Sequence, residues 1–233
     1  MTGARGHGGT GARGLVVLAL FCAPVPLCLG APPLAAQDPD PIVDRAVATF
    51  QRVSTLRADF SQRVNDPMIG TDESSRGEYL AQRPNKFAMR WRHPAGDLIV
   101  ADGQTLWVYL PSTTPNQVIR SAITRGGQSA DVIGEFLDHP REHFTIAWVR
   151  ADSVNRRPAD VLAFTPKAAN APYSRVLVWI DRRDNLPHQV EISEASGSVR
   201  RVTLDRIQVN GGVTARDFVF TPPSGARVVD ASQ

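Results

Sequence analysis

The amino-acid sequence predicts a mainly β protein, in which about eleven strands form one antiparallel sheet accompanied by a few helices. Apolar residues alternate with small or charged ones along most of the chain, as at Phe87, Met89 and Trp91, and a period of two is typical of a strand with one buried face. Turn signals such as Asp102-Gly103 separate these stretches. Because the strands do not alternate regularly with helices, we expect the sheet to be antiparallel.

The first 36 residues have the three-part layout of a secretory signal peptide. Arg5 and Arg13 precede an apolar run over residues 15–29, and alanines and prolines then lead to an expected cleavage site after Ala36. The apolar run is too short to cross a bilayer comfortably. We therefore expect residues 1–36 to be removed and residues 37–233 to form a single soluble domain.

Both cysteines of the chain, Cys22 and Cys28, lie within this segment. Attachment of a lipid to one of them is the alternative to simple cleavage, but Phe21 and Leu27 stand where a lipid-attachment motif needs a small residue. Cleavage after Ala36 leaves the mature chain without a disulfide and without a thiol for metal binding or catalysis.

The charge balance gives no reason to expect a nucleic-acid partner. The formal net charge of +3 falls to +1 once Arg5 and Arg13 are removed. Paired arginines such as Arg182-Arg183 lie beside aspartates, so the sequence indicates solvated strand ends and not a basic patch.

An amphipathic helix is expected at the start of the mature chain. Asp40 and Pro41 suit the N-cap and the first helical position, and apolar residues then recur at helical spacing to about Ser54. From Leu56 onward the period becomes two. The expected strands lie, in chain order, near residues 56–60, 76–82, 87–92, 98–100, 104–110, 116–122, 143–150, 160–165, 175–181, 186–194 and 199–209.

A second helical stretch is expected within residues 126–138. Val132, Ile133, Phe136 and Leu137 share one face of a helix of barely three turns, whose middle residue, Gly134, weakens it. Such a helix has to lean on the sheet, which makes the segment a candidate for a movable lid. The alternative is an ordinary packing helix that never opens.

Residues 139–143 spell H-x-x-E-H, a pattern found in zinc peptidases. That chemistry needs both imidazoles on one helical face, but Pro140 interrupts the segment and strand alternation begins at Phe144. A zinc hydrolase that uses His139 and His143 is therefore only a remote alternative to a polar loop. Because the chain also lacks a G-x-S-x-G elbow and a phosphate-binding loop, we expect no catalytic activity, no metal and no cofactor.

The strand near residues 104–110 carries more apolar area than a solvated surface strand needs. Leu106 and Val108 lie on one of its faces, and Trp107 and Tyr109 lie on the other. Two interpretations follow from these residues alone: a sheet packed shut by its helices, or a half-barrel that encloses a ligand cavity.

Short motifs in a fixed order carry a resemblance to a known family. They are Phe60-Ser61-Gln62, Gly77-Glu78-Tyr79-Leu80, Arg83-Pro84-Asn85 with Phe87 and Trp91, Val100-Ala101-Asp102-Gly103, Leu106-Trp107, Tyr109-Leu110-Pro111, Thr165-Pro166-Lys167 and Phe218-Val219-Phe220-Thr221-Pro222-Pro223-Ser224-Gly225. In this order and spacing they resemble the periplasmic outer-membrane lipoprotein carrier family (LolA-like), over most of the mature chain.

The resemblance implies an incomplete antiparallel β-barrel of about eleven strands covered by a helical lid. It implies a periplasmic carrier that binds the acyl chains of lipoproteins in an apolar cavity and shuttles them from the inner to the outer membrane. Its expected partners are an inner-membrane lipoprotein-releasing transporter as donor and an outer-membrane acceptor, and a monomer is expected. Relatives of this fold also carry or sense other lipids, so a carrier or sensor of another lipid or glycolipid is the main alternative.

The resemblance also assigns roles to individual residues. Arg83 matches the family position whose arginine latches the lid, and Phe87 matches a position at the entrance for cargo or partner. The alternatives are a surface arginine and a plain core phenylalanine. The cavity-lining candidates, chosen by the face on which they lie, are Trp91, Leu106, Val108, Ile133, Phe136, Val176, Val178 and Ile180.

Overall fold

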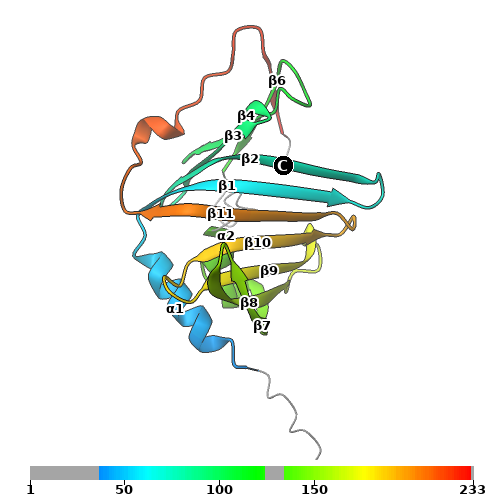
Figure 1. Cartoon of the computed structure of the whole chain (residues 1–233). Helices are drawn as coiled ribbons and strands as arrows, with labels where there is room; N and C mark the ends of the chain where they lie inside the picture. The colour runs from blue at the N-terminus through cyan, green and yellow to red at the C-terminus, as the bar shows by residue number, and fades with distance from the viewer. Residues whose placement is uncertain (1–36, 124–133, 232–233) are drawn as a thin grey trace, which may run out of the picture. The chain divides into compact units, whose positions relative to one another are not determined.

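One twelve-stranded sheet runs through the described part of the chain (Figure 1). The structure is a computed structural model that describes residues 37–123 and 134–231, all within the unit Ala36–Gln233. The strands lie in the order β12-β6-β5-β4-β3-β2-β1-β11-β10-β9-β8-β7. Within the described residues the two outermost strands, β12 and β7, are therefore not paired with each other, and the sheet is not closed.

The strands follow the predicted ones closely, and most are longer. They are β1 Thr55–Asp66, β2 Thr71–Gln82, β3 Lys86–His93, β4 Ala95–Asp102, β5 Thr105–Tyr109, β6 Gln117–Ala122, β7 Phe144–Val154, β8 Arg157–Pro166, β9 Tyr173–Asp181, β10 Pro187–Glu194, β11 Val199–Val209 and β12 Arg227–Asp230. The prediction of a mainly β protein with a few helices is confirmed.

The last strand was not predicted, and it changes the topology. β12 pairs with β6 in a parallel register that begins at Arg227 opposite Gln117, whereas every other neighbouring pair of strands is antiparallel. The predicted antiparallel sheet is therefore confirmed for all pairs of strands except this one at the edge. Four residues after a proline- and glycine-rich stretch offer too short a pattern to reveal a strand.

Helix α1, Asp40–Gln51, begins one residue earlier than predicted, with Pro39 as its N-cap. It buries Ile42, Val43, Ala46 and Phe50. It also ends three residues before the predicted Ser54. The side chain of Asn210, which follows β11, bonds the backbone just after the helix. Asn210 accepts a hydrogen bond from the Ser54 N–H (2.7 Å) and donates one to the Arg52 carbonyl (3.1 Å), which turns the chain from helix into β1.

Two short helices precede β7. Helix α2 is Gly134–Leu137 and helix α3 is Pro140–His143. Ile133 and the rest of the predicted helix before Gly134 lie outside the described residues. His143 closes a helical turn, so the prediction of a polar loop at 139–143 is wrong there: Pro140 starts a new turn instead of only breaking the old one.

The two faces of the sheet are covered by different parts of the chain. The face that carries Phe60, Tyr79 and Leu162, here called the inner face, forms the main core together with α1 and α2. On the opposite, outer face, a smaller core joins Leu80 to Phe218 of the short helix η1, Ala215–Phe218. Within the described residues, no helix is both long and apolar enough to span a bilayer.

Candidate functional site

Arg83 lies directly after β2 and joins this end of the sheet to α1. Its Nη1 donates a hydrogen bond to the Phe50 carbonyl at 3.0 Å, and its guanidinium carbon lies 4.6 Å from the centroid of the Phe50 ring. Carbonyls in the last turn of a helix have no partner within the helix, so a guanidinium with several donors suits them. The side chain is 31% exposed, and Nη2 lies 4.0 Å from a carboxylate oxygen of Asp138, just after α2.

The predicted latch is therefore attached differently from the expectation. The hydrogen bond goes to a carbonyl of α1, and within the described part of the segment, residues 134–138, Arg83 reaches Asp138 through a long ion pair. A tertiary contact between β2 and a helix more than thirty residues earlier leaves no local pattern in the sequence. The role of Arg83 as a latch stays a prediction.

Two further polar contacts hold the helices, and sequence reasoning missed both. The Tyr173 hydroxyl donates to Glu135 of α2 at 2.6 Å, and burial together with this carboxylate raises the pKa of Tyr173 above its usual range. Arg141 of α3 lies 3.0 Å from a carboxylate oxygen of Asp40 and 2.8 Å from one of Asp44, both on α1. Helices α1, α2 and α3 are thus fastened by a few identifiable side chains.

The predicted cavity residues that the structure describes share the inner face. Phe136, Val176, Val178 and Ile180 belong to the main core, and Trp91 packs against it with its ring 5.2 Å from that of Phe60. Leu106 and Val108 on β5 are half-buried. Their partners on β4 are Ala101 and Ile99, which places both side chains on the inner face. Whether these residues line a ligand cavity stays a prediction.

The inner face is closely packed in this structure. Two small cavities reach it, each of about 10 Å³, which is room for about one water molecule. The first is lined by Tyr79, Met89, Pro187, Gln189, Val190, Val202 and Leu204, and the second by residues at the end of α1 and around Arg83.

Phe87 is buried on the inner face, with 4% of its surface exposed, and it pairs with Ala81 and Ala101 on the neighbouring strands. A partner approaching the protein surface does not meet this side chain in the present arrangement. Its role at an entrance stays a prediction.

The apolar residues on the second side of β5, Trp107 and Tyr109, lie on the outer face and are covered there. Trp107 and Tyr109 lie with their ring centroids 5.8 Å and 6.0 Å from that of Phe220. The C-terminal segment therefore covers the apolar residues that the sequence left without a partner.

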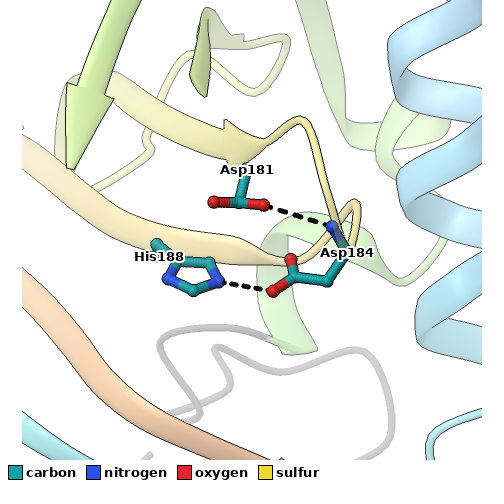
Figure 2. A group of neighbouring side chains, drawn as sticks. All are labelled: Asp181, Asp184 and His188. Atoms are coloured by element: carbon teal, nitrogen blue, oxygen red, sulfur yellow. Dashed lines mark hydrogen bonds and ion pairs between the residues drawn. The ribbon is translucent and has the colours of Figure 1, made fainter. Parts of the chain in front are cut away.

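Among the described residues, His139 and His143 do not belong to a group of potential metal ligands. His139 adopts a left-handed backbone conformation (φ 51°) before α3, and it lies outside the group of potential metal ligands found among the described residues. That group is Asp181, Asp184 and His188, whose ligand atoms lie within 4.8 Å of one another (Figure 2). The D-x-x-D-x-x-x-H spacing is visible in the sequence and was missed.

A guanidinium already fills the place of a cation in this group. Arg157 donates to both oxygens of Asp181, at 2.6 and 2.9 Å, and to Asp184 at 2.6 Å. Burial raises the pKa of Asp181, but hydrogen bonds from Arg157 and from two backbone N–H groups outweigh it, so the pKa lies below its usual range. The group is best explained as a turn between β9 and β10 that is stabilised by an ion pair.

These features define a class of protein: an open β-sheet whose apolar inner face is covered by short helices, without a constellation of groups suited to catalysis among the described residues. The chain belongs to the LolA family, since the family model "Outer membrane lipoprotein carrier protein LolA" matches residues 51–221. It is accordingly a member of a periplasmic family of lipoprotein carriers, which are transport proteins and not enzymes. The resemblance drawn from the sequence is confirmed.

Individual relatives agree with this placement. The outer-membrane lipoprotein carrier protein of Alkalilimnicola ehrlichii is 27% identical over 182 residues, which cover 78% of this chain and 80% of that protein. The one of Bordetella avium is 29% identical over 195 residues, covering 80% and 86%. Among solved structures, an uncharacterized conserved protein from Thermus thermophilus superposes with a TM-score of 0.53 at 14% identity, covering 84% of this chain and 100% of that one, which is a likeness of fold alone.

Proposed function

We propose that this protein binds the acyl chains of lipoproteins against the inner face of its sheet and carries them across the periplasm from the inner to the outer membrane. The observation that carries the proposal is the covered apolar face. A continuous core extends in sheet order from β3 across β1 and β11 to β8, and it lies beneath helices that a few polar contacts hold in place. An inner-membrane transporter would load the carrier, and an outer-membrane acceptor would unload it.

The energetics explain why a cover is needed. Burying one acyl chain of about sixteen carbons, at about 0.8 kcal/mol per methylene, releases on the order of 12 kcal/mol. A carrier that bound its cargo with all of this free energy would not release it. Because the cavities at the inner face hold about one water molecule each, α1 or α2 has to move before a chain can bind, and the free energy of closure is subtracted from the affinity.

The exported protein is expected to bind a fluorescent acyl probe saturably, with a stoichiometry near one. The reason is that a displaced cover exposes one continuous apolar face and not several separate patches. Fluorescence titration measures the binding, and displacement by a lipoprotein, but not by its deacylated form, identifies the acyl chains as the recognised group. Displacement by a free lipid or glycolipid alone would favour another cargo instead.

A pair of valines provides a matched control for this titration. Val108→Asn places an amide on the inner face and is expected to weaken probe binding about tenfold, whereas Val228→Asn changes a valine on β12 that is 41% exposed and should leave binding unchanged. If the two substitutions have equal effects, or if the wild type shows no saturable binding, the sheet is permanently closed by its helices and does not bind acyl chains.

We also propose that residues 1–36 are a cleaved signal and that the mature carrier, residues 37–233, is a monomer free of lipid. Intact-mass measurement of the exported protein is expected to give a chain that begins near Gln37 without an acyl group. A mature chain that starts at Cys22 or Cys28 with added diacylglycerol would contradict the proposal, because a tethered protein cannot shuttle between two membranes.

A further inference from the structure

The turn of the β1–β2 hairpin presents two neighbouring apolar side chains to solvent. Met68 is 80% exposed and Ile69 is 72% exposed, the highest values among the large apolar side chains of the described residues. Single exposed apolar residues are common on protein surfaces, but two adjacent ones at the end of a hairpin form a small apolar tip that is available for contact with another surface. Neither residue takes part in the cores or in the contacts that hold the helices.

The tip is held in shape by its own turn. A carboxylate oxygen of Asp66 accepts a hydrogen bond from the Met68 N–H at 2.9 Å, and Gly70 supplies the left-handed conformation (φ 68°) that starts the return strand. Behind the turn, Arg63 and Asp72 form an ion pair across the two strands. An ordered turn therefore presents Met68 and Ile69. Contact of these two side chains with another surface costs little conformational entropy, because the backbone of the turn is already fixed.

The tip is separated from the contacts that hold the helices. β1 and β2 are each 12 residues long, and Figure 1 shows the hairpin turn at the opposite end of β1 from α1. At about 3.3 Å per residue, roughly 35–40 Å separate Met68 from Arg83. A change at the tip can therefore be tested without disturbing the latch.

The chemistry of the tip favours a bilayer as its partner. A methionine and an isoleucine on an exposed turn offer neither the aromatic nor the arginine anchors that contribute most to binding at protein interfaces. Between residues 63 and 73, Arg63 is the sole cation and is paired, whereas Asp66, Asp72 and Glu73 are acidic. Beside this end of β1, Arg200 and Arg201 of β11 are paired with Glu194 and Glu191. This charge pattern does not favour an anionic surface, so the apolar pair fits a zwitterionic one.

We propose that Met68 and Ile69 insert into the interfacial region of a zwitterionic phospholipid bilayer and dock the carrier reversibly on the membrane. The inference rests on the proposed function, since a carrier of acylated cargo has to approach a bilayer to exchange it. Two aliphatic side chains give weak binding, which suits a protein that has to leave the membrane again.

Flotation with phosphatidylcholine vesicles tests the proposal on the exported protein. The wild type is expected to bind at millimolar lipid, and the double variant Met68→Ser/Ile69→Ser to bind at least about tenfold more weakly. Binding should change little between low and high salt, because Arg63, Arg200 and Arg201, the described arginines at this end of β1 and β11, are each paired with a carboxylate. In Ile69→Trp, quenching of the added tryptophan by brominated acyl chains should place residue 69 within the bilayer.

Val219→Ser is the matched control, because Val219 is 67% exposed but stands alone on the C-terminal segment, and its variant should bind vesicles like the wild type. The inference is overturned if the wild type does not bind vesicles, if the double serine variant binds as well as the wild type, or if Val219→Ser weakens binding equally. Titration with the acyl probe separates the two proposals. If the double variant binds both the probe and the vesicles like the wild type, only the proposal of membrane docking fails. If the wild type binds no probe, the proposed carrier function fails.

Discussion

Replacing Arg83 with leucine is expected to leave loading of cargo intact and to slow its transfer to an acceptor about ten- to a hundredfold. The substitution removes a charge-assisted hydrogen bond to the Phe50 carbonyl, which contributes roughly 1.5–3 kcal/mol to the closed arrangement. The exposed ion pair with Asp138 at 4.0 Å adds little. Because the open, loaded form does not need this contact, cargo is accepted and then poorly released. Transfer of a labelled lipoprotein from loaded carrier to acceptor vesicles measures the effect.

A second arginine at the same end of α1 serves as the control. Among the described residues, the Arg52 side chain reaches only Thr49 in the last turn of α1, at 3.4 Å, so Arg52→Leu removes a neighbouring charge without detaching the helix from the sheet. Its transfer rate should equal that of the wild type, and both variants should keep the wild-type far-UV spectrum. If Arg83→Leu transfers cargo as fast as the wild type, or if Arg52→Leu slows transfer equally, Arg83 is a surface arginine and not a latch.

Replacing Gly77 with alanine is expected to lower the melting temperature by roughly 6–12 °C. A Cβ atom at this position would lie 2.1 Å from the Arg90 carbonyl oxygen and 2.7 Å from a ring carbon of Phe60. The first neighbour is backbone in the paired strand β3, and the second is a phenylalanine that is 2% exposed and has Trp91 against its ring, so neither can move cheaply. The separation of β2 and β3 therefore has to increase. Thermal unfolding followed by circular dichroism measures the change.

Gly211→Ala is the corresponding control, because apart from the glycine's own chain neighbours no described atom lies within 4 Å of the Cβ that it would add. Its melting temperature should stay within about 2 °C of the wild type. A Gly77→Ala protein that melts together with Gly211→Ala would show that β2 and β3 tolerate a wider separation.

Alternation with a period of two was sufficient to predict most of the sheet and the face of most candidate residues. Val176, Val178 and Ile180 reach the inner face because successive side chains of a strand point to opposite sides, a rule that needs no tertiary information. The short strand β12 escaped prediction because its pairing depends on β6, about a hundred residues earlier in the chain.

The contacts that hold the helices were much less predictable. Tyr173 and Glu135 are 38 residues apart, and Arg83 and Phe50 are 33 apart, so their contacts arise only when the sheet is assembled. Resemblance to a family singled out Arg83 but not its acceptor on α1. The apolar pair Met68-Ile69 was visible in the sequence, yet its exposure could be known only once the turn was placed beyond the inner-face core.

The absence of pairing between β7 and β12 in the described sheet has a mechanical consequence. In a closed barrel, the number of strands and their stagger fix the radius, so the interior cannot widen without breaking a ladder. A sheet with two free margins can unroll by small changes of twist spread over all its strands, and every backbone hydrogen bond is kept. Such a sheet deforms elastically. Its curvature would adjust to one hydrocarbon chain or to several without any single hinge residue.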